Sequence, residues 1–174
     1  MESNNIIDEF IKESNAIERV YDDVSFHNAK RAWDYLDTHE FMSPELVKNV
    51  HDMLMDSDTS WSEPKLKSKY RGVFRDCPVY IGGHEAMKAE VVGSALMQWC
   101  YSMNSTSKRE GTPDELEQVS RDLHVEYEGI HPFIDGNGRT GRMFMNWWRV
   151  RAGLPVLAIH EGEEQMAYYK WFKQ

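Results

Sequence analysis

The spacing of apolar residues predicts helices over most of the chain. Apolar side chains recur every three or four positions, which places them on one face of a helix. One such stripe runs over residues 7–21 and a shorter one over residues 26–36. Ser43-Pro44-Glu45 is a good helix start, because serine caps the first turn and proline fits its first position. The inward residues of that helix are Leu46, Val47, Val50 and Leu54.

The second half of the chain continues the helical pattern. A long helix is predicted over residues 85–103, and another from the capping box Thr112-Pro113-Asp114-Glu115 to Gly129. Two more are expected, one over residues 139–151 that ends before Gly153 and one over residues 163–172. The residues of this last helix expected to face inward, as core, are Met166, Tyr168 and Tyr169.

Residues 70–83 depart from this pattern. Residues 75–78 interrupt the segment and Gly82-Gly83 closes it, so a short β-hairpin is expected to stand off a helical body. The predicted fold class is therefore all-α, a mainly helical bundle with one short β-hairpin. The strand-favouring residues in the segment are Tyr70, Val73, Phe74, Val79, Tyr80 and Ile81.

Length, charge and cysteine content narrow the class of protein. The 174 residues suit one domain, and 20 basic against 29 acidic residues give a net charge of −9. Such a chain repels nucleic acids and anionic membranes unless its basic residues cluster, so neither is an expected partner. Cys77 and Cys100 have no metal-binding spacing, and the histidines form no zinc site. The opening residues do not resemble a signal peptide and no apolar stretch could span a bilayer, so a cytoplasmic, soluble protein is expected.

The segment 131–142, HPFIDGNGRTGR, concentrates the candidate chemistry. Gly136, Asn137 and Gly138 form a turn directly before a helix. Backbone N–H groups and the positive end of the helix dipole meet at such a turn, which makes an anion site whose usual occupant is phosphate. No other glycine-rich phosphate loop occurs in the sequence, so this turn is the nucleotide-site candidate.

Basic side chains follow the turn. No acidic residue occurs between Gly136 and His160, whereas Arg139 and Arg142 share one helix face with Asn146. Two guanidinium groups on one face can hold adjacent phosphates of a di- or triphosphate. Asn146 is expected either to contact the nucleotide or to serve as a satisfied structural amide.

The loop also carries a base and a ligand for a hard metal ion. His131, with an ordinary pKa of about 6.5, can accept a proton at neutral pH. Asp135 precedes the phosphate turn, where a carboxylate can hold Mg²⁺ between phosphate oxygens. Phe133 is expected to point into the core and keep the loop rigid, and His124, one heptad before His131, is expected to be structural.

These residues closely resemble the signature of the Fic family, HPFx[DE]GNGRxxR. All defined positions of the signature are present, and chance agreement is negligible at about one in twenty per position. The likeness extends over most of residues 60–174, including a flap-like segment and the stretch 151–155. The matching residues are His131, Pro132, Phe133, Asp135, Gly136, Asn137, Gly138, Arg139 and Arg142.

The resemblance implies a protein adenylyltransferase that uses ATP and Mg²⁺. His131 would deprotonate a Ser, Thr or Tyr hydroxyl of a target protein, and the oxygen would attack the α-phosphate of ATP and expel pyrophosphate. Asp135 would hold the Mg²⁺. The anion hole would be formed by the 136–138 backbone together with Asn137, and Arg139 and Arg142 would bind the β- and γ-phosphates.

The resemblance also implies how the target is held and which group is transferred. The flap residues Val79, Tyr80 and Ile81 would align the target by β-strand addition. Doc-type members, which phosphorylate their targets, carry Lys where this chain has Gly138, so AMP transfer is favoured here. A target protein is the expected partner, and the same chemistry allows self-modification.

A second motif lies near the N-terminus. Many Fic proteins carry an inhibitory helix with the pattern [ST]xxxE[GN], and Ser14 and Glu18 fit it, although Arg19 replaces the Gly or Asn. Glu18 would share a helix face with the apolar stripe and pair with Arg142 in place of the γ-phosphate. The alternative is an exposed Glu in a solvated pair, worth less than about 1 kcal/mol. The expected organisation is an inhibitory helix over residues 1–22 and a Fic-like catalytic domain over residues 23–174.

Three alternatives use the same residues differently. A protein-AMP hydrolase would run the site in reverse, with Glu18 orienting water. A nucleotide-binding interaction module would be catalytically silent, and the intact His131 and Asp135 argue against it. A purely structural helical domain leaves the composition of the loop unexplained. The sequence does not specify the nucleotide base, the target or the oligomeric state.

Overall fold

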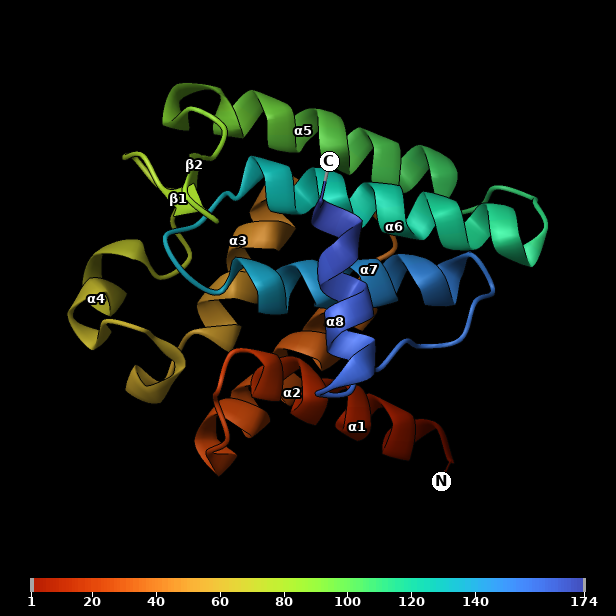
Figure 1. The fold of residues 1–174 in the computed structure, drawn as a ribbon, viewed down its shortest axis with the longest axis horizontal. Helices are drawn as coiled ribbons and strands as arrows, with labels where there is room; N and C mark the ends of the chain where they lie inside the picture. The colour runs from red at the N-terminus through yellow and green to blue at the C-terminus, as the bar shows by residue number, and fades with distance from the viewer. Residues whose placement is uncertain (1, 174) are drawn as a thin grey trace.

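Helix α7 (Asn137–Arg151) is the central element of the fold, and the other long helices pack around it (Figure 1). The computed structural model describes residues 2–173. Over these residues eight α-helices and one antiparallel hairpin confirm the predicted all-α class. The other helices are α1 (Glu2–Ile17), α2 (Asp23–Asp37), α3 (Pro44–Leu54), α4 (Lys67–Tyr70), α5 (Ala89–Thr106), α6 (Pro113–Ile130) and α8 (Glu163–Tyr169), with 3-10 turns η1 (Asp58–Ser60), η2 (Pro64–Leu66) and η3 (Lys170–Phe172).

Aromatic side chains on α7 fill the centre of the molecule. Phe144, Trp147 and Trp148 of this helix are fully buried. Trp99 of α5 packs with its ring 5.0 Å from that of Tyr127 on α6, and both rings contact Phe144. Burial of one large apolar side chain stabilises the fold by about 1.5–3 kcal/mol. The packing therefore holds the first turn of α7, which carries the candidate site, on a rigid support.

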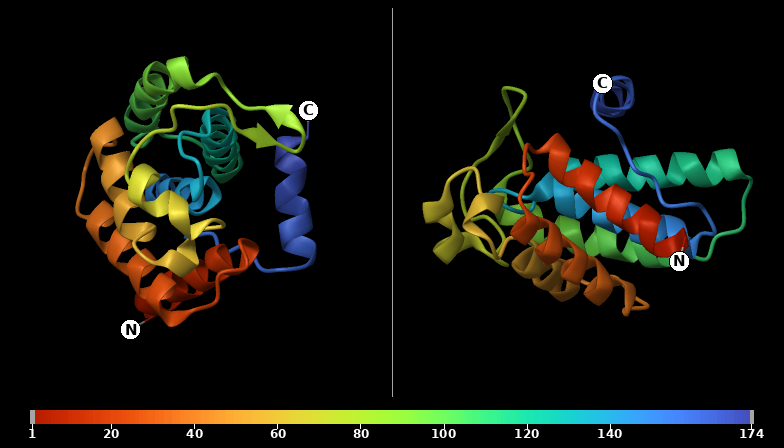
Figure 2. Two further views of the ribbon diagram at one scale, coloured as in Figure 1. Left: turned by 90° about the vertical axis from the view of Figure 1, so that its left-hand side faces the viewer. Right: turned by 90° about the horizontal axis from the view of Figure 1, so that it is seen from below.

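The N-terminal helix belongs to the same core. Phe10 and Ile11 of α1 are buried, and the Phe10 ring lies 5.7 Å from that of Trp33 on α2. Helix α1 also contacts α7 directly, and the right-hand view of Figure 2 shows it lying along the bundle. The C-terminal end of α1 is thereby brought to the N-terminal end of α7.

Capping residues set several helix boundaries. Ser43 caps α3 and the Thr112 capping box opens α6, both as expected. Helix α2 starts at Asp23, earlier than predicted, because the Asp22 side chain accepts the backbone N–H of Ser25. No helix within residues 2–173 is both long enough and apolar enough to cross a membrane.

Two predicted helix limits are wrong by a few residues. Helix α6 passes through Gly129 and ends at Ile130, because His131 takes the left-handed cap conformation that a glycine usually adopts. Helix α5 begins at Ala89, since the residues before it belong to the hairpin, and it continues to Thr106.

The hairpin also differs from its predicted extent. Strand β1 (Tyr80–Ile81) pairs with β2 (His84–Glu85). Gly82 and Gly83, predicted to close the segment, form its turn, with φ angles of 56° and 86°. Two successive residues at positive φ suit the tight turn between antiparallel strands. In place of the predicted first strand, Tyr70 ends the short helix α4 and is buried.

The C-terminal helix α8 crosses in front of α7 in Figure 1. Of the three residues predicted to face inward, Tyr168 is buried, whereas Met166 is 67% exposed and Tyr169 is 45% exposed, so the prediction was wrong for these two. Only one narrow face of this short helix reaches the bundle. There the Tyr168 hydroxyl hydrogen-bonds His124 and accepts from Arg142, which attaches α8 to α6 and α7.

Candidate active site

The 131–136 loop joins two helix ends with two residues in the left-handed conformation. His131 caps α6 at φ 49°, and Gly136 precedes α7 at φ 77°. Such a conformation costs a non-glycine residue about 1–2 kcal/mol, so the surroundings of His131 must hold it in place. A Cβ at Gly136 would lie 2.7 Å from Sδ of Met55, so close packing as well as backbone conformation requires glycine there.

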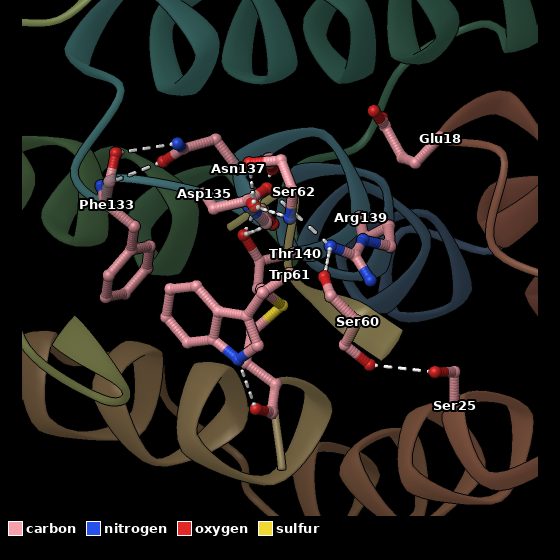
Figure 3. Close-up of polar contacts among 12 residues, drawn as sticks. Glu18, Ser25, Ser60, Trp61, Ser62, Phe133, Asp135, Asn137, Arg139 and Thr140 are labelled. Carbon is pink, nitrogen blue, oxygen red and sulfur yellow. Dashed lines mark hydrogen bonds and ion pairs between the residues drawn. The ribbon is translucent and has the colours of Figure 1, made fainter. Parts of the chain in front are cut away.

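The Asn137 side chain fixes the shape of this loop (Figure 3). Its Oδ1 accepts the backbone N–H of Phe133, and its Nδ2 donates to the Phe133 carbonyl at 2.8 Å. Phe133 is fully buried as expected, and its ring stacks on His51 at 3.7 Å. In this conformation the Asn137 side chain secures the turn, which leaves the backbone of the turn to meet a ligand.

His51 supports the loop from α3. Its Nδ1 accepts the N–H of Gly72, so its Nε2 donates to the Asp135 carbonyl at 3.0 Å. Burial lowers the pKa of His51 to about 4, which keeps the ring neutral as this pair of hydrogen bonds requires. This role of His51 could not be predicted from the sequence, because nothing local links it to a residue 84 positions away.

His131 lies at the wall of the candidate site as a neutral base. Burial, with a smaller contribution from the nearby Arg75, lowers the pKa of His131 to about 4. Its Nδ1 lies 3.8 Å from Oε2 of Glu128. The Glu128 side chain is only 15% exposed, and its partial burial raises the pKa of its carboxyl to about 7. At neutral pH the imidazole is therefore unprotonated and free to accept a proton.

A cavity of about 540 Å³ opens beside His131. One wall is polar, with Glu18, Glu128 and Arg142, and the turn reaches it at Gly138. The rest of the lining is mainly apolar or aromatic and comes from the hairpin, α6 and the C-terminal segment. Its residues are Ile81, Val125, Tyr168, Tyr169 and Phe172.

Arg139 is buried at the first turn of α7 with spare donors. Its Nη2 donates to the Ser60 carbonyl at 2.6 Å and lies 3.8 Å from Oδ1 of Asp135 (Figure 3). Its Nε and Nη1 are buried and have no hydrogen-bond partner among the described residues. A buried donor without a partner costs about 1–3 kcal/mol, so this guanidinium is ready to bind an anion.

Arg142 carries the predicted ion pair with Glu18. Its Nη2 lies 2.8 Å from Oε1 of Glu18 and donates to the Ser14 carbonyl, while Nε donates to the Ser14 hydroxyl. Both residues of the N-terminal motif thus contact one buried guanidinium. A Cβ at Gly138 would collide with the Glu18 carboxylate and lie 2.9 Å from Nη1 of Arg142, so the pair sits directly over the turn.

The backbone around Glu18 differs from the expectation. Helix α1 ends at Ile17, so Glu18 belongs to the following turn and does not share the apolar face of the helix. Arg19 has a φ of 59°, in the left-handed region. This conformation gives a physical reason for the Gly or Asn of the family pattern, since both residues adopt it readily.

Asp135 lies between the turn and the segment 60–62. Its Oδ2 accepts the N–H and the hydroxyl of Ser62 at 2.7 and 2.8 Å, and its Oδ1 accepts the N–H of Gly136. Over residues 2–173 no group of three or more His, Cys, Asp and Glu is arranged around a metal position. The Asp135 carboxylate is thus held in a fixed orientation next to the turn at 136–138.

A sequence profile of the Fic/DOC family matches residues 41–148, more than half of the chain. The chain belongs to the Fic/DOC family. The match begins before residue 60, where the likeness was expected to start, and it includes the whole signature loop 131–142.

Curated relatives named protein adenylyltransferase Fic share part of this chain. The protein of Drosophila grimshawi is 33% identical over 102 residues, and that of Drosophila persimilis is 37% identical over 108 residues. Each alignment covers 59% of this chain but only 20% and 19% of the relatives, so the chain spans about a fifth of their length.

Solved Fic structures share the fold over nearly the whole chain. A Fic domain containing signaling protein from Bacteroides thetaiotaomicron superposes with a TM-score of 0.77, covering 97% of this chain and 71% of that one, at 16% identity. Fic-1 of C. elegans (residues 134–508) superposes with a TM-score of 0.66, covering 98% of this chain and 55% of that one, at 18% identity. At these identities the likeness establishes the fold.

Two of the candidate residues have structural partners within the Fic domain. Asn146 is completely buried, and its amide donates to the Leu157 carbonyl and accepts the Leu157 N–H, so it fastens residues 152–160 to α7. Its hydrogen-bonding groups are thus used within the protein, the structural alternative of the sequence analysis. His124 is also buried, and burial lowers its pKa to about 3, as suits a neutral packing residue.

The flap residues lie at the edge of the cavity. Tyr80 is 68% exposed, and Ile81 lines the cavity that contains His131. Val79 accepts the N–H of Ala86 and so extends the pairing by one rung beyond the strands. Because the described sheet has two strands, each strand keeps one unpaired edge where an extended chain could add.

Sequence reasoning missed the apolar wall and the segment that faces the turn. Tyr168 and Tyr169 were expected to be core packing residues, although they line the cavity, and Phe172, which also lines it, was given no role. Ser60 and Ser62 contact Arg139 and Asp135 from more than 70 positions away. The polar cluster SDTSWS at residues 57–62 was the available signal, since a short polar run between helices is where a site is often built.

Proposed function

We propose that this chain is a Mg²⁺-dependent nucleotidyltransferase that moves AMP from ATP onto a Ser, Thr or Tyr hydroxyl of a target protein. One observation carries the proposal: a neutral, partly buried imidazole, His131, shares a cavity with the N-terminal turn of α7 and the guanidinium of Arg142. A base beside a polyphosphate site is what transfer to a hydroxyl requires. The names of the curated relatives support the same class.

The phosphates would occupy the start of α7. The backbone of residues 136–138 supplies N–H groups at the positive end of the helix. The free Nε and Nη1 of Arg139 suit the β-phosphate, and Arg142 suits the γ-phosphate once Glu18 has left. Because Gly138 has no side chain, no Cβ stands beside Arg142 at the position that the Glu18 carboxylate now occupies.

The donors around Asp135 fit a magnesium ion bound together with a nucleotide. Mg²⁺ is commonly held by one or two carboxylates plus substrate phosphates and water, not by a cage made only of protein groups. Asp135 is such a carboxylate, oriented by Ser62 and placed 3.8 Å from Arg139. When bound, the ion would neutralise phosphate charge during transfer.

The proposed transfer is one displacement at the α-phosphorus of ATP. Nε2 of His131 takes the proton of the target hydroxyl, since Nδ1 faces Glu128. The hydroxyl oxygen forms a bond to the α-phosphorus, and the bond from that phosphorus to the oxygen bridging to the β-phosphate breaks. Pyrophosphate leaves and the AMP group remains on the target.

The apolar wall is suited to the nucleoside. Tyr169, Phe172 and Ile81 of the flap line the same cavity, and aromatic rings are suited to stacking on a planar base. An exposed edge of the flap would align the target backbone by strand addition, with Val79 and Tyr80 beside it. A hydroxyl of the chain itself that reached this position would be modified in the same way.

Glu18 would keep the enzyme inactive until it is displaced. Its carboxylate bonds Arg142 and lies over Gly138, in the place proposed for a phosphate. A nucleotide can bind there in its productive position only when the pair opens. The free thiols Cys77 and Cys100 fit a reducing compartment, and we propose the cytoplasm as the place of action.

A protein-AMP hydrolase is the second candidate. The observation in its favour is that Glu18 lines the same cavity as His131, where a carboxylate could orient an attacking water. In that case removal of Glu18 would abolish activity instead of releasing it, so one variant separates the two functions.

Labelled ATP, Mg²⁺ and the purified chain provide the test. The Glu18→Gly variant should label itself or an added lysate protein with an adenosine phosphate group, and UTP, GTP and CTP in parallel report the base preference. His131→Ala in the same background should lower transfer by about 10²- to 10⁴-fold while nucleotide binding persists.

His27→Ala, a change at an exposed histidine, is the matched control and should transfer at the parent rate. Loss of a preformed AMP adduct would favour the hydrolase. Nucleotide binding without transfer or removal would leave a silent binding module as the function.

A further inference from the structure

Arg75 is a buried arginine that the proposed chemistry does not use. It lies in the segment between α4 and β1 and is only 3% exposed. No acidic side chain pairs with it among the described residues; its partners there are backbone carbonyl groups. Burial lowers the pKa of Arg75, and carbonyl oxygens compensate the buried charge.

Part of this set of bonds holds the end of α6. Nε of Arg75 donates to the His131 carbonyl at 2.7 Å, and Nη2 donates to the Ile130 carbonyl at 3.3 Å. The backbone N–H of Arg75 donates to the Pro132 carbonyl at 2.9 Å. The last carbonyls of a helix have no partner within it and carry partial negative charge, and α6 has no basic residue in its own last turn. Arg75 supplies that cation from elsewhere in the chain and holds His131 in its left-handed conformation.

The same guanidinium also holds both sides of the hairpin. Nη1 donates to the Cys77 carbonyl at 3.0 Å, before β1, and Nη2 donates to the Met87 carbonyl, after β2. We infer that Arg75 is a positioning residue that holds the base His131 and the flap in one fixed geometry. The inference rests on the proposed function, because it takes His131 as the base and the hairpin as the edge that receives the target.

The planar shape of the side chain explains why arginine is needed. Its donors point in fixed directions and reach carbonyls on two segments at once, whereas a lysine ammonium is a single point of charge. With the flap and the base joined in this way, a hydroxyl presented by a strand on the flap arrives at a set distance from Nε2 of His131. A misplacement of about 1 Å can cost about 100-fold in rate.

The test uses the full chain with Glu18→Gly as the parent. Arg75→Lys and Arg75→Met are compared with Arg149→Lys, a matched control at a buried arginine that binds Glu117 and the Pro155 carbonyl, away from the hairpin. Autonucleotidylation with labelled ATP and Mg²⁺ gives kcat and the KM for ATP. Hydrogen exchange of residues 77–87 and 130–133 reports the two segments without requiring activity.

Arg75→Lys should lower kcat by about 10- to 100-fold and leave the KM for ATP unchanged, because the phosphate site is not altered. Hydrogen exchange should become faster in both segments together, and in neither for Arg149→Lys. Arg75→Met should in addition move the acid limb of the rate profile to higher pH, since removal of the cation raises the pKa of His131. The other groups that act on this ring, Glu128 and Asp135, are the same in all variants.

Three results would overturn the inference: kcat equal to that of the Arg149→Lys control, a KM that rises in step with the loss of rate, or faster exchange in one segment alone. If the parent transfers no nucleotide at all, the proposed function fails, and hydrogen exchange still decides whether Arg75 couples the two segments.

Discussion

Removal of the Glu18 carboxylate should release the phosphate site. In the resting chain its Oε1 bonds Nη2 of Arg142 and its carboxylate lies over Gly138. Glu18→Gly deletes the carboxylate and leaves the other partners of Arg142, which are the Ser14 hydroxyl and carbonyl and the Tyr168 hydroxyl. The fold should therefore persist while the site becomes open to nucleotide.

The size of the effect follows from the exposure of the pair. A hydrogen bond between charged groups contributes about 1.5–3 kcal/mol when buried. Here Arg142 is buried but the Glu18 side chain is 38% exposed, so solvent screening reduces the contribution to about 1–2 kcal/mol. An internal competitor of that strength lowers the apparent affinity for ATP by about 5- to 30-fold. The Glu18→Gly variant should therefore bind ATP more tightly than its parent by the same factor.

Calorimetric titration with Mg·ATP measures the affinity of the Glu18→Gly variant and of the chain with Glu18 intact. Both proteins carry His131→Ala to prevent turnover. The same change at another exposed turn glutamate, Glu161→Gly, is the control; it removes only a hydrogen bond from Tyr21. Equal affinities for Glu18→Gly and its parent would show that the carboxylate does not compete with phosphate. The regulatory part of the proposed function would then fall.

Two further predictions concern stability. Arg19→Gly should raise the free energy of unfolding by about 1 kcal/mol, because Arg19 adopts a φ of 59°, which strains any residue with a Cβ. Urea titration measures the difference, and the control Arg19→Ala should give no such gain. In the folded chain, burial raises the pKa of Glu128 from 4.5 to about 7. Between pH 4.5 and pH 7 the unfolded chain therefore binds fewer protons than the folded chain, and the free energy of unfolding falls as the pH rises. Glu128→Gln should remove up to roughly 3 kcal/mol of this pH dependence, and urea titrations at pH 5 and pH 8 with an unchanged difference would contradict the assignment.

The parts of the site that the sequence predicted are those governed by short-range rules. The turn at 136–138 follows from glycines placed before a helix, and the placement of Phe133 in the core follows from its alternation with polar neighbours. The pair between Glu18 and Arg142 spans 124 positions. It could be predicted only because a family pattern names both ends.

Other contacts leave no periodic signal. Ser62 and His51 reach the loop from distant segments, and Arg75 reaches it through carbonyls, which are the same in every residue type. A sequence shows which side chains are present but not which backbone groups a fold leaves without partners. The turn of the hairpin, in contrast, could have been placed correctly, since Gly82-Gly83 is a strong signal for a two-residue loop.

The arrangement of helix ends gives a physical reason to expect an anion at this site. Helices α1 and α6 end, and α7 begins, at the same cavity. Arg75 neutralises the carbonyl end of α6, so that end cannot balance the positive charge at the start of α7. The first turn of α7 therefore keeps free N–H groups beside two buried guanidinium groups, and in a folded chain such donors are costly unless an acceptor is present. Glu18 provides part of the missing charge in the resting chain, but it reaches only Arg142 and leaves Nε and Nη1 of Arg139 without partners. A polyphosphate would satisfy both guanidinium groups, and we therefore expect a nucleotide to displace the internal carboxylate.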